Sequence, residues 1–147
     1  MADRFDPQMF VAVQGGCIDR VREELAQGRK QTHWMWFMFP QIAGLGSSPI
    51  ARRFGIAGLA EARAYLAHPV LGPRLRELTA IVIASGEDDP RRIFGHVDAL
   101  KFCSCLTLFR LAAPQEELFH AALEKFFAGH DDERTLQIMR DAGNLPK

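Results

Sequence analysis

Residues 96–112 read HVDALKFCSCLTLFRLA, and this stretch decides the fold. Apolar residues occupy almost every side of the helix that it predicts, and Pro114 stops that helix soon after its end. A helix that is apolar on all sides is usually the buried centre of a domain. We therefore expect the rest of the chain to pack around residues 96–112.

Segments with helical periodicity lie on both sides of this centre, separated by glycine, proline and polar turns. Glu24 is expected on the solvent side of its helix, and 81–83 is expected as helix because no strand partner is evident. Asp131 or Asp132 is expected to cap the last helix, which Gly143 closes. The expected helices, before that last one, cover 7–14, 17–27, 59–67, 71–84, 96–112 and 115–128.

The predicted architecture is a single all-α domain over residues 1–147, built as an irregular bundle of about seven or eight helices around the central one. Positive and negative charges balance at 18 each, which argues against nucleic acid as a partner. No apolar run approaches the roughly 20 residues that span a bilayer, so no membrane partner is predicted.

The polar N-terminus shows no secretory signal, and three cysteines do not form a disulfide framework. These two features predict a cytoplasmic protein with reduced thiols.

The most unusual stretch is 33–41, His-Trp-Met-Trp-Phe-Met-Phe-Pro-Gln, which holds both tryptophans of the chain. Pro40 limits any helix here to end near Phe39. Aromatic rings fill cores, and they also stack on planar ligands. The stretch is therefore either plain core or the wall of a pocket. In the second case the residues expected to face the opening are His33, Trp34, Trp36 and Gln41.

Polar residues interrupt the central helix at steps of three, and they are Asp98, Lys101, Ser104, Thr107 and Arg110. On an ideal helix, each step of three residues falls about 60° short of a full turn, so only neighbours in the series lie close together. Asp98 and Lys101 are such a pair. Either they form a structural ion pair, or Lys101 enters the same cavity as His33 and there binds an anion or acts as a base.

Two other patterns carry less information. The loop 44–48 has glycines and serines, but it lacks the third glycine and the strand–loop–helix context of a phosphate loop, so a turn is favoured. Ser47 and Ser48, with Arg52 and Arg53 nearby, form a weaker anion candidate. The five histidines show no metal-binding spacing, so neither a metal nor another cofactor is predicted.

Several short segments together resemble a known family. They include 28–30, 33–41, 44–46, 68–72 and 98–101, and the resemblance covers nearly the whole chain. The family is a bacterial group of small proteins classed as a domain of unknown function, and the resemblance implies a mainly helical fold. It brings no established activity or catalytic residue. Members sometimes carry the label calpastatin, although nothing in these residues suggests an extended inhibitor segment.

The candidate residues cluster in two segments, 32–46 and 98–107, which we expect to meet at one pocket for a planar or anionic, nucleotide-like small molecule. One alternative is a non-catalytic module that docks a partner protein through the aromatic patch, and another is a purely structural core. The sequence leaves open whether the protein is an enzyme. The candidate catalytic residues are His33 and Lys101, and the candidate binding residues are Arg29, Trp34, Trp36, Gln41, Asp98 and Ser104.

Overall fold

The structure is a computed structural model and describes residues 5–145. Within that range the regular elements are ten helices, with one isolated parallel bridge between Ile42 and Ile56. The helices are α1 (Pro7–Gly15), α2 (Ile18–Ala26), α3 (Met35–Met38), α4 (Pro49–Phe54), α5 (Leu59–Ala67), α6 (Leu71–Ala84), α7 (Pro90–Phe94), α8 (His96–Ala112), α9 (Glu117–Phe127) and α10 (Glu133–Asp141).

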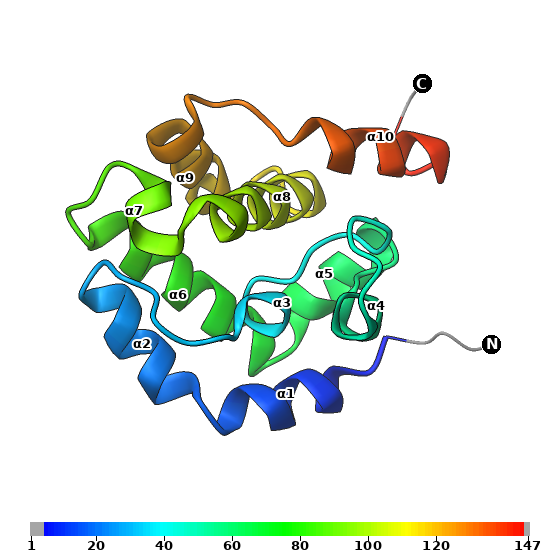
Figure 1. Cartoon of the computed structure of the whole chain (residues 1–147). Coiled ribbons are helices and arrows are strands. Elements are labelled where there is room, and N and C mark those ends of the chain that lie inside the picture. Colours follow the sequence, from blue (N-terminus) through cyan, green and yellow to red (C-terminus); the bar gives the residue numbers. More distant parts are fainter. Residues whose placement is uncertain (1–4, 146–147) are drawn as a thin grey trace.

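The buried centre is α8, as the sequence predicted. Ten of its 17 residues are buried. It packs against α9 and α10 on one side and against α5 on the other (Figure 1). Ser104 and Thr107 fit into this apolar setting because their hydroxyls donate to the carbonyls of Leu100 and Cys103, one turn earlier.

The all-α fold class is confirmed, and residues 81–83 lie within α6 as helix. The helices outnumber the expected seven or eight because α3, α4 and α7 are only four to six residues long. Such short segments give too little periodicity to be recognised in a sequence. Asp132 caps α10 by accepting a hydrogen bond from the Thr135 backbone nitrogen at 2.9 Å. No helix in the described range is long and apolar enough to cross a membrane.

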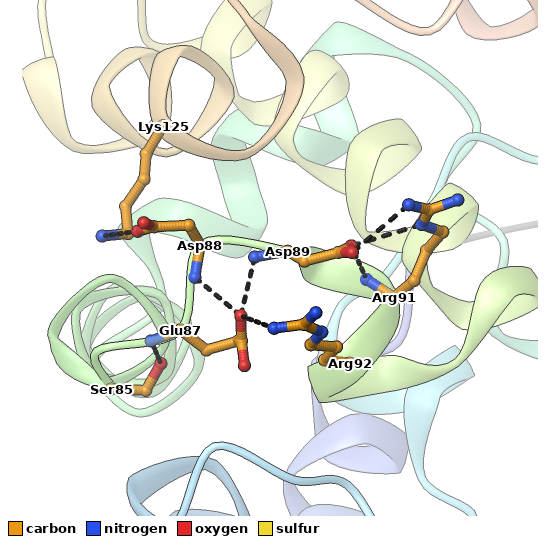
Figure 2. A network of polar contacts seen from close by, with 7 residues as sticks. All are labelled: Ser85, Glu87, Asp88, Asp89, Arg91, Arg92 and Lys125. Carbon is orange, nitrogen blue, oxygen red and sulfur yellow. Dashed lines mark hydrogen bonds and ion pairs between the residues drawn. The ribbon is translucent and has the colours of Figure 1, made fainter.

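A polar network between α6 and α7 sets where α7 begins (Figure 2). The Glu87 carboxylate accepts from the backbone nitrogens of Asp88 and Asp89, and Asp89 in turn caps α7 through the Arg91 nitrogen. These hydrogen bonds lie at the surface, so their main effect is on the local path of the chain. At the end of α7, the carbonyl of Ile93 accepts from the backbone nitrogen of Lys30 at 2.7 Å.

The chain reaches the aromatic run by a turn after α2. Gly28 adopts a left-handed conformation (φ 73°) there, as its position after the last helical turn requires. The buried Gln14 of α1 holds the aromatic run in place through two hydrogen bonds. The Gln14 amide nitrogen donates to the Phe37 carbonyl at 2.8 Å and to the Tyr65 hydroxyl at 2.9 Å. Helix α3 therefore has a fixed position between α1, α4 and the interior.

Candidate functional site

A buried carboxylate, that of Glu24 in α2, holds the loop that leads into the aromatic run. It accepts four hydrogen bonds: from the backbone nitrogens of Gln31 and Thr32, from the Thr32 hydroxyl, and from the indole nitrogen of Trp34 at 2.9 Å. Burial alone raises the pKa of Glu24, but these hydrogen bonds outweigh burial and lower the pKa from 4.5 to about 2. Glu24 is thus a charged anchor for Trp34.

The expectation that Glu24 faces solvent is wrong, because its side chain lies in the interior and the residue is only 5% exposed. Glu24 follows Val21 by three residues, so it borders the apolar face of α2 rather than lying opposite to it. The spacing of Glu24 relative to Val21 is visible in the sequence. What the sequence did not show was the set of donors that makes burial of a carboxylate tolerable.

Beside this anchor, a pocket of about 140 Å³ opens where the loop, α3, the start of α4 and the first turns of α8 meet. The polar and aromatic residues that line it come from two distant parts of the chain. They are Lys30, His33, Trp34, Trp36, Phe37, Asp98 and Lys101.

Asp98 lies between two lysines in this pocket. Its carboxylate is 2.9 Å from the Lys30 ammonium and 3.1 Å from the Lys101 ammonium, and all three side chains are mostly buried. Burial raises the pKa of Asp98, but the contacts with the two ammoniums dominate and hold it below its usual range. Two positive charges face one negative charge, so these three groups leave a surplus of one positive charge.

Each lysine also lies over a tryptophan ring. The Lys30 ammonium is 5.0 Å from the ring centroid of Trp34, and the Lys101 ammonium is 4.5 Å from that of Trp36. Trp34 is buried, whereas Trp36 is half-buried and offers the ring that a ligand can reach. Gly46 backs this ring so closely that an added Cβ would lie 2.8 Å from it.

The structure brings together five of the eight candidate residues named from the sequence. His33 is exposed at the pocket, Trp34 and Trp36 form part of its wall, and Asp98 and Lys101 reach it from α8. The Asp98–Lys101 ion pair and the shared cavity with His33 were stated as alternatives, and in the structure they coexist.

The other three candidates do not reach the pocket. Arg29 is exposed elsewhere, and its neighbour Lys30 takes the place expected for it, because successive side chains of an extended segment point in opposite directions. Gln41 is buried beyond Pro40, 2% exposed. Ser104 is buried within α8 and donates to the Leu100 carbonyl.

Most of the aromatic run is core. Its buried side chains include Phe39, which packs edge-on against Phe94 and Phe102. The one-turn helix α3 ends at Met38, consistent with the limit that Pro40 sets. Because Trp36 alone among the tryptophans and phenylalanines of the run is not buried, the run does not present the exposed aromatic patch that a docking module requires.

The weaker patterns have structural explanations. Ser48 caps α4 by accepting from the Ala51 backbone nitrogen at 3.2 Å. Residues 44–48 form a loop, as expected. The part of the chain that the structure describes holds no cluster of three or more histidine, cysteine or acidic side chains suited to a metal ion.

Comparison with known proteins places these features in a family. Residues 4–139 match the family model described as "Protein of unknown function (DUF1810)". The chain belongs to this family. The match runs from before α1 into α10, so it includes both segments that form the pocket. The resemblance read from the sequence is thereby confirmed.

A solved structure shares the fold of this DUF1810 protein. It is the conserved hypothetical protein Rv1873 from Mycobacterium tuberculosis, which is 48% identical and has a TM-score of 0.89. The similarity covers 92% of this chain and 97% of that chain. A search of curated proteins gives no significant match. The function therefore has to be argued from the site itself.

Proposed function

We propose that this protein binds a small anionic molecule in the pocket that Trp36, Asp98 and Lys101 help to line. The observation that carries the proposal is the sharing of one carboxylate, Asp98, by two mostly buried ammoniums. An anion that enters the pocket gains a charge-assisted contact with a lysine whose charge is only partly balanced. The half-buried ring of Trp36 supplies an adjacent apolar surface for the uncharged part of the ligand.

The size of the pocket narrows the ligand. Pockets that enclose a drug-sized molecule measure roughly 300–1,000 Å³. This one measures about 140 Å³, which is room for a carboxylate or phosphate group and a few attached atoms. A nucleotide would therefore place its phosphate here and keep its base largely outside.

Binding is the part of the hypothesis that the geometry supports best. The ion pair with Asp98 favours a role for Lys101 in charge recognition rather than as a base. His33 is exposed at the pocket edge, within the same hollow. It remains our candidate for proton transfer if the bound molecule reacts.

The chain offers a matched control for Lys101. Lys125 of α9 also combines an ion pair, 3.1 Å to Asp88, with an aromatic ring, that of Phe126 at 5.6 Å. Lys125 does not line the pocket. Replacing either lysine removes the same kinds of contact, but only one replacement changes the proposed site.

The test is to titrate the protein with phosphate, benzoate and adenosine monophosphate and to measure binding by thermal shift and calorimetry. We expect at least one of the three to stabilise the protein in a saturable way. Lys101→Gln should weaken that binding about tenfold, and Lys125→Gln should leave it unchanged. Binding that is equally strong in both variants, or absent for all three probes, contradicts the proposal.

We further propose that the protein works in the cytoplasm. All three cysteines are free thiols, and Cys103 and Cys105 are buried. Thiols persist in reduced form in that compartment. Cell fractionation with an antibody against the protein tests this, and recovery from an extracytoplasmic fraction contradicts it.

A further inference from the structure

A second, larger hollow adjoins the cationic pocket. It is a groove of about 940 Å³ between α1 and α4, and Met9, Val13 and Phe54 contribute to its mostly apolar wall. Phe37 and Ile50 line both hollows and form the border between them. Ile50 is 43% exposed, so this border is open to solvent and a ligand can lie across it.

The two hollows have complementary character. The smaller one carries the positive surplus of Lys30 and Lys101, while the groove offers aliphatic and thioether side chains. The two charged groups that line the groove have opposite signs: the Asp6 carboxylate caps α1, and the Arg53 guanidinium lies over the Phe54 ring and contacts Met9, so together they add no net charge. Nothing in this arrangement calls for a second charge on the ligand at the groove end.

A third hollow on the opposite side differs in kind. It lies at the start of α2, where Gly15, Cys17, Asp19 and Arg20 form its wall, and it meets the cationic pocket at His33 and Trp34. Its wall is mixed, about half polar, and carries charges of both signs, whereas the wall of the α1–α4 groove is mostly apolar. An apolar extension of the ligand therefore finds its complementary surface toward α4 rather than toward α2.

We infer that the ligand of the proposed site is an amphipathic anion, with a carboxylate or phosphate head beside Lys101 in the cationic pocket and one apolar chain along the α1–α4 groove. The inference rests on the proposed function and adds the chemical class of the ligand. The head fixes the orientation, and the chain supplies affinity in proportion to the apolar area that it buries. Met9 suits such a chain because methionine adapts its shape to flexible partners.

A homologous series of monomeric carboxylates tests this: acetate, butanoate, hexanoate and octanoate, titrated by NMR and calorimetry. We expect affinity to rise by about threefold to fourfold for each added methylene until the groove is filled. Lys101→Gln should weaken every member of the series by a similar factor. A flat series in the wild-type protein overturns the inference.

Variants in the groove separate head from chain. Met9→Gln keeps the side-chain length but adds polarity, and Ala12→Asp places a charge at an exposed position of the groove where folding is not at risk. Both should weaken octanoate about tenfold or more and leave acetate unchanged. Val97→Thr is the matched control, because Val97 is 62% exposed and lines neither hollow. If neither groove variant changes the affinity for octanoate, the inference is overturned.

The outcomes distinguish the two proposals. If acetate or phosphate binds through Lys101 and chain length has no effect, the inference fails and the proposed function stands. If chain length matters but Lys101→Gln has no effect on any member, the proposed function fails and the amphipathic anion with it. A last arm uses vesicles of phosphatidylcholine with phosphatidylglycerol: binding to these without binding to octanoate points to a membrane surface and also overturns the inference.

Discussion

Trp34 and Trp36 are two residues apart, each lies under a lysine, and yet their surroundings differ in kind. Around Trp34, the Glu24 carboxylate is satisfied by uncharged donors of the same loop. Around Trp36, the Asp98 carboxylate is held by two ammoniums. We call the first region the anchor and the second the pocket.

The difference lies in which partners can be exchanged. The donors of the anchor are fixed by the backbone and the core, so removing their carboxylate leaves buried N–H groups without an acceptor. The ammoniums of the pocket sit at the end of long side chains, and Lys101 lines the hollow, so an incoming anion can share its ammonium with Asp98. Similar residue types thus serve stability in one region and binding in the other.

Glu24→Gln breaks the anchor, and we expect the largest loss of stability from it. In the variant, the amide NH₂ group would face N–H and O–H groups that in the wild-type protein donate to the carboxylate. A donor facing donors leaves buried groups without an acceptor. The free energy of unfolding should fall by about 3 kcal/mol, measured by urea unfolding with the slope unchanged. Glu23→Gln is the control, because Glu23 is exposed on the same helix. An equal loss in both variants contradicts the role of the anchor.

The pKa of Glu24 predicts how the stability from the anchor depends on pH. Because the folded state lowers it from 4.5 to about 2, the contribution is complete above pH 4.5 and is lost as the pH falls toward 2. The contribution of this one group amounts to about 3 kcal/mol when fully present. We therefore expect the stability difference between wild type and Glu24→Gln to shrink below pH 4.5. A difference that stays constant down to about pH 3 would refute the assignment.

Replacing each tryptophan by phenylalanine compares the two regions directly. Trp34→Phe removes a hydrogen bond to a buried carboxylate and part of a buried ring, so the free energy of unfolding should fall by about 2 kcal/mol. Trp36→Phe should cost less than about 1 kcal/mol, because the ring is only half-buried. It should instead weaken anion binding. The reverse order of stabilities would show that Trp36, rather than Trp34, belongs to the core.

Several helix boundaries were predictable from the sequence because a local signal marks them. Asp132 at the start of α10 acts through its own side chain, and Gly28 after α2 and Pro40 after α3 act through their own backbone, so none of these signals depends on a distant contact. The all-apolar pattern likewise identified α8 as the centre. The short helices α4 and α7 were missed because segments of six and five residues show too little periodicity, although a capping residue and a proline mark the start of each.

The residues of the site were predictable only where a charged residue stands among apolar neighbours in the sequence. Lys101 and Asp98 stood out in an apolar helix, and both line the pocket. Lys30 sits in a polar loop where nothing distinguishes it from Arg29, and its role follows from the contact with Ile93 that fixes the loop. Gln41 bordered the aromatic run in sequence but lies inside the core. Adjacency in sequence cannot tell which side of an extended segment faces a pocket.

Asp98→Asn should have a modest effect on stability and the most informative effect on binding. The amide keeps an oxygen near both ammoniums, so we expect a cost of about 1 kcal/mol. The positive surplus rises from one charge to two, and because no carboxylate then competes for the ammoniums, phosphate should bind more tightly and with a steeper salt dependence. Asp88→Asn is the control, since Asp88 pairs with Lys125 but its side chain is 86% exposed. If Asp98→Asn weakens phosphate binding, the carboxylate positions the lysines rather than competing for them, and the pocket would then act as a preformed unit in which no partner is exchanged.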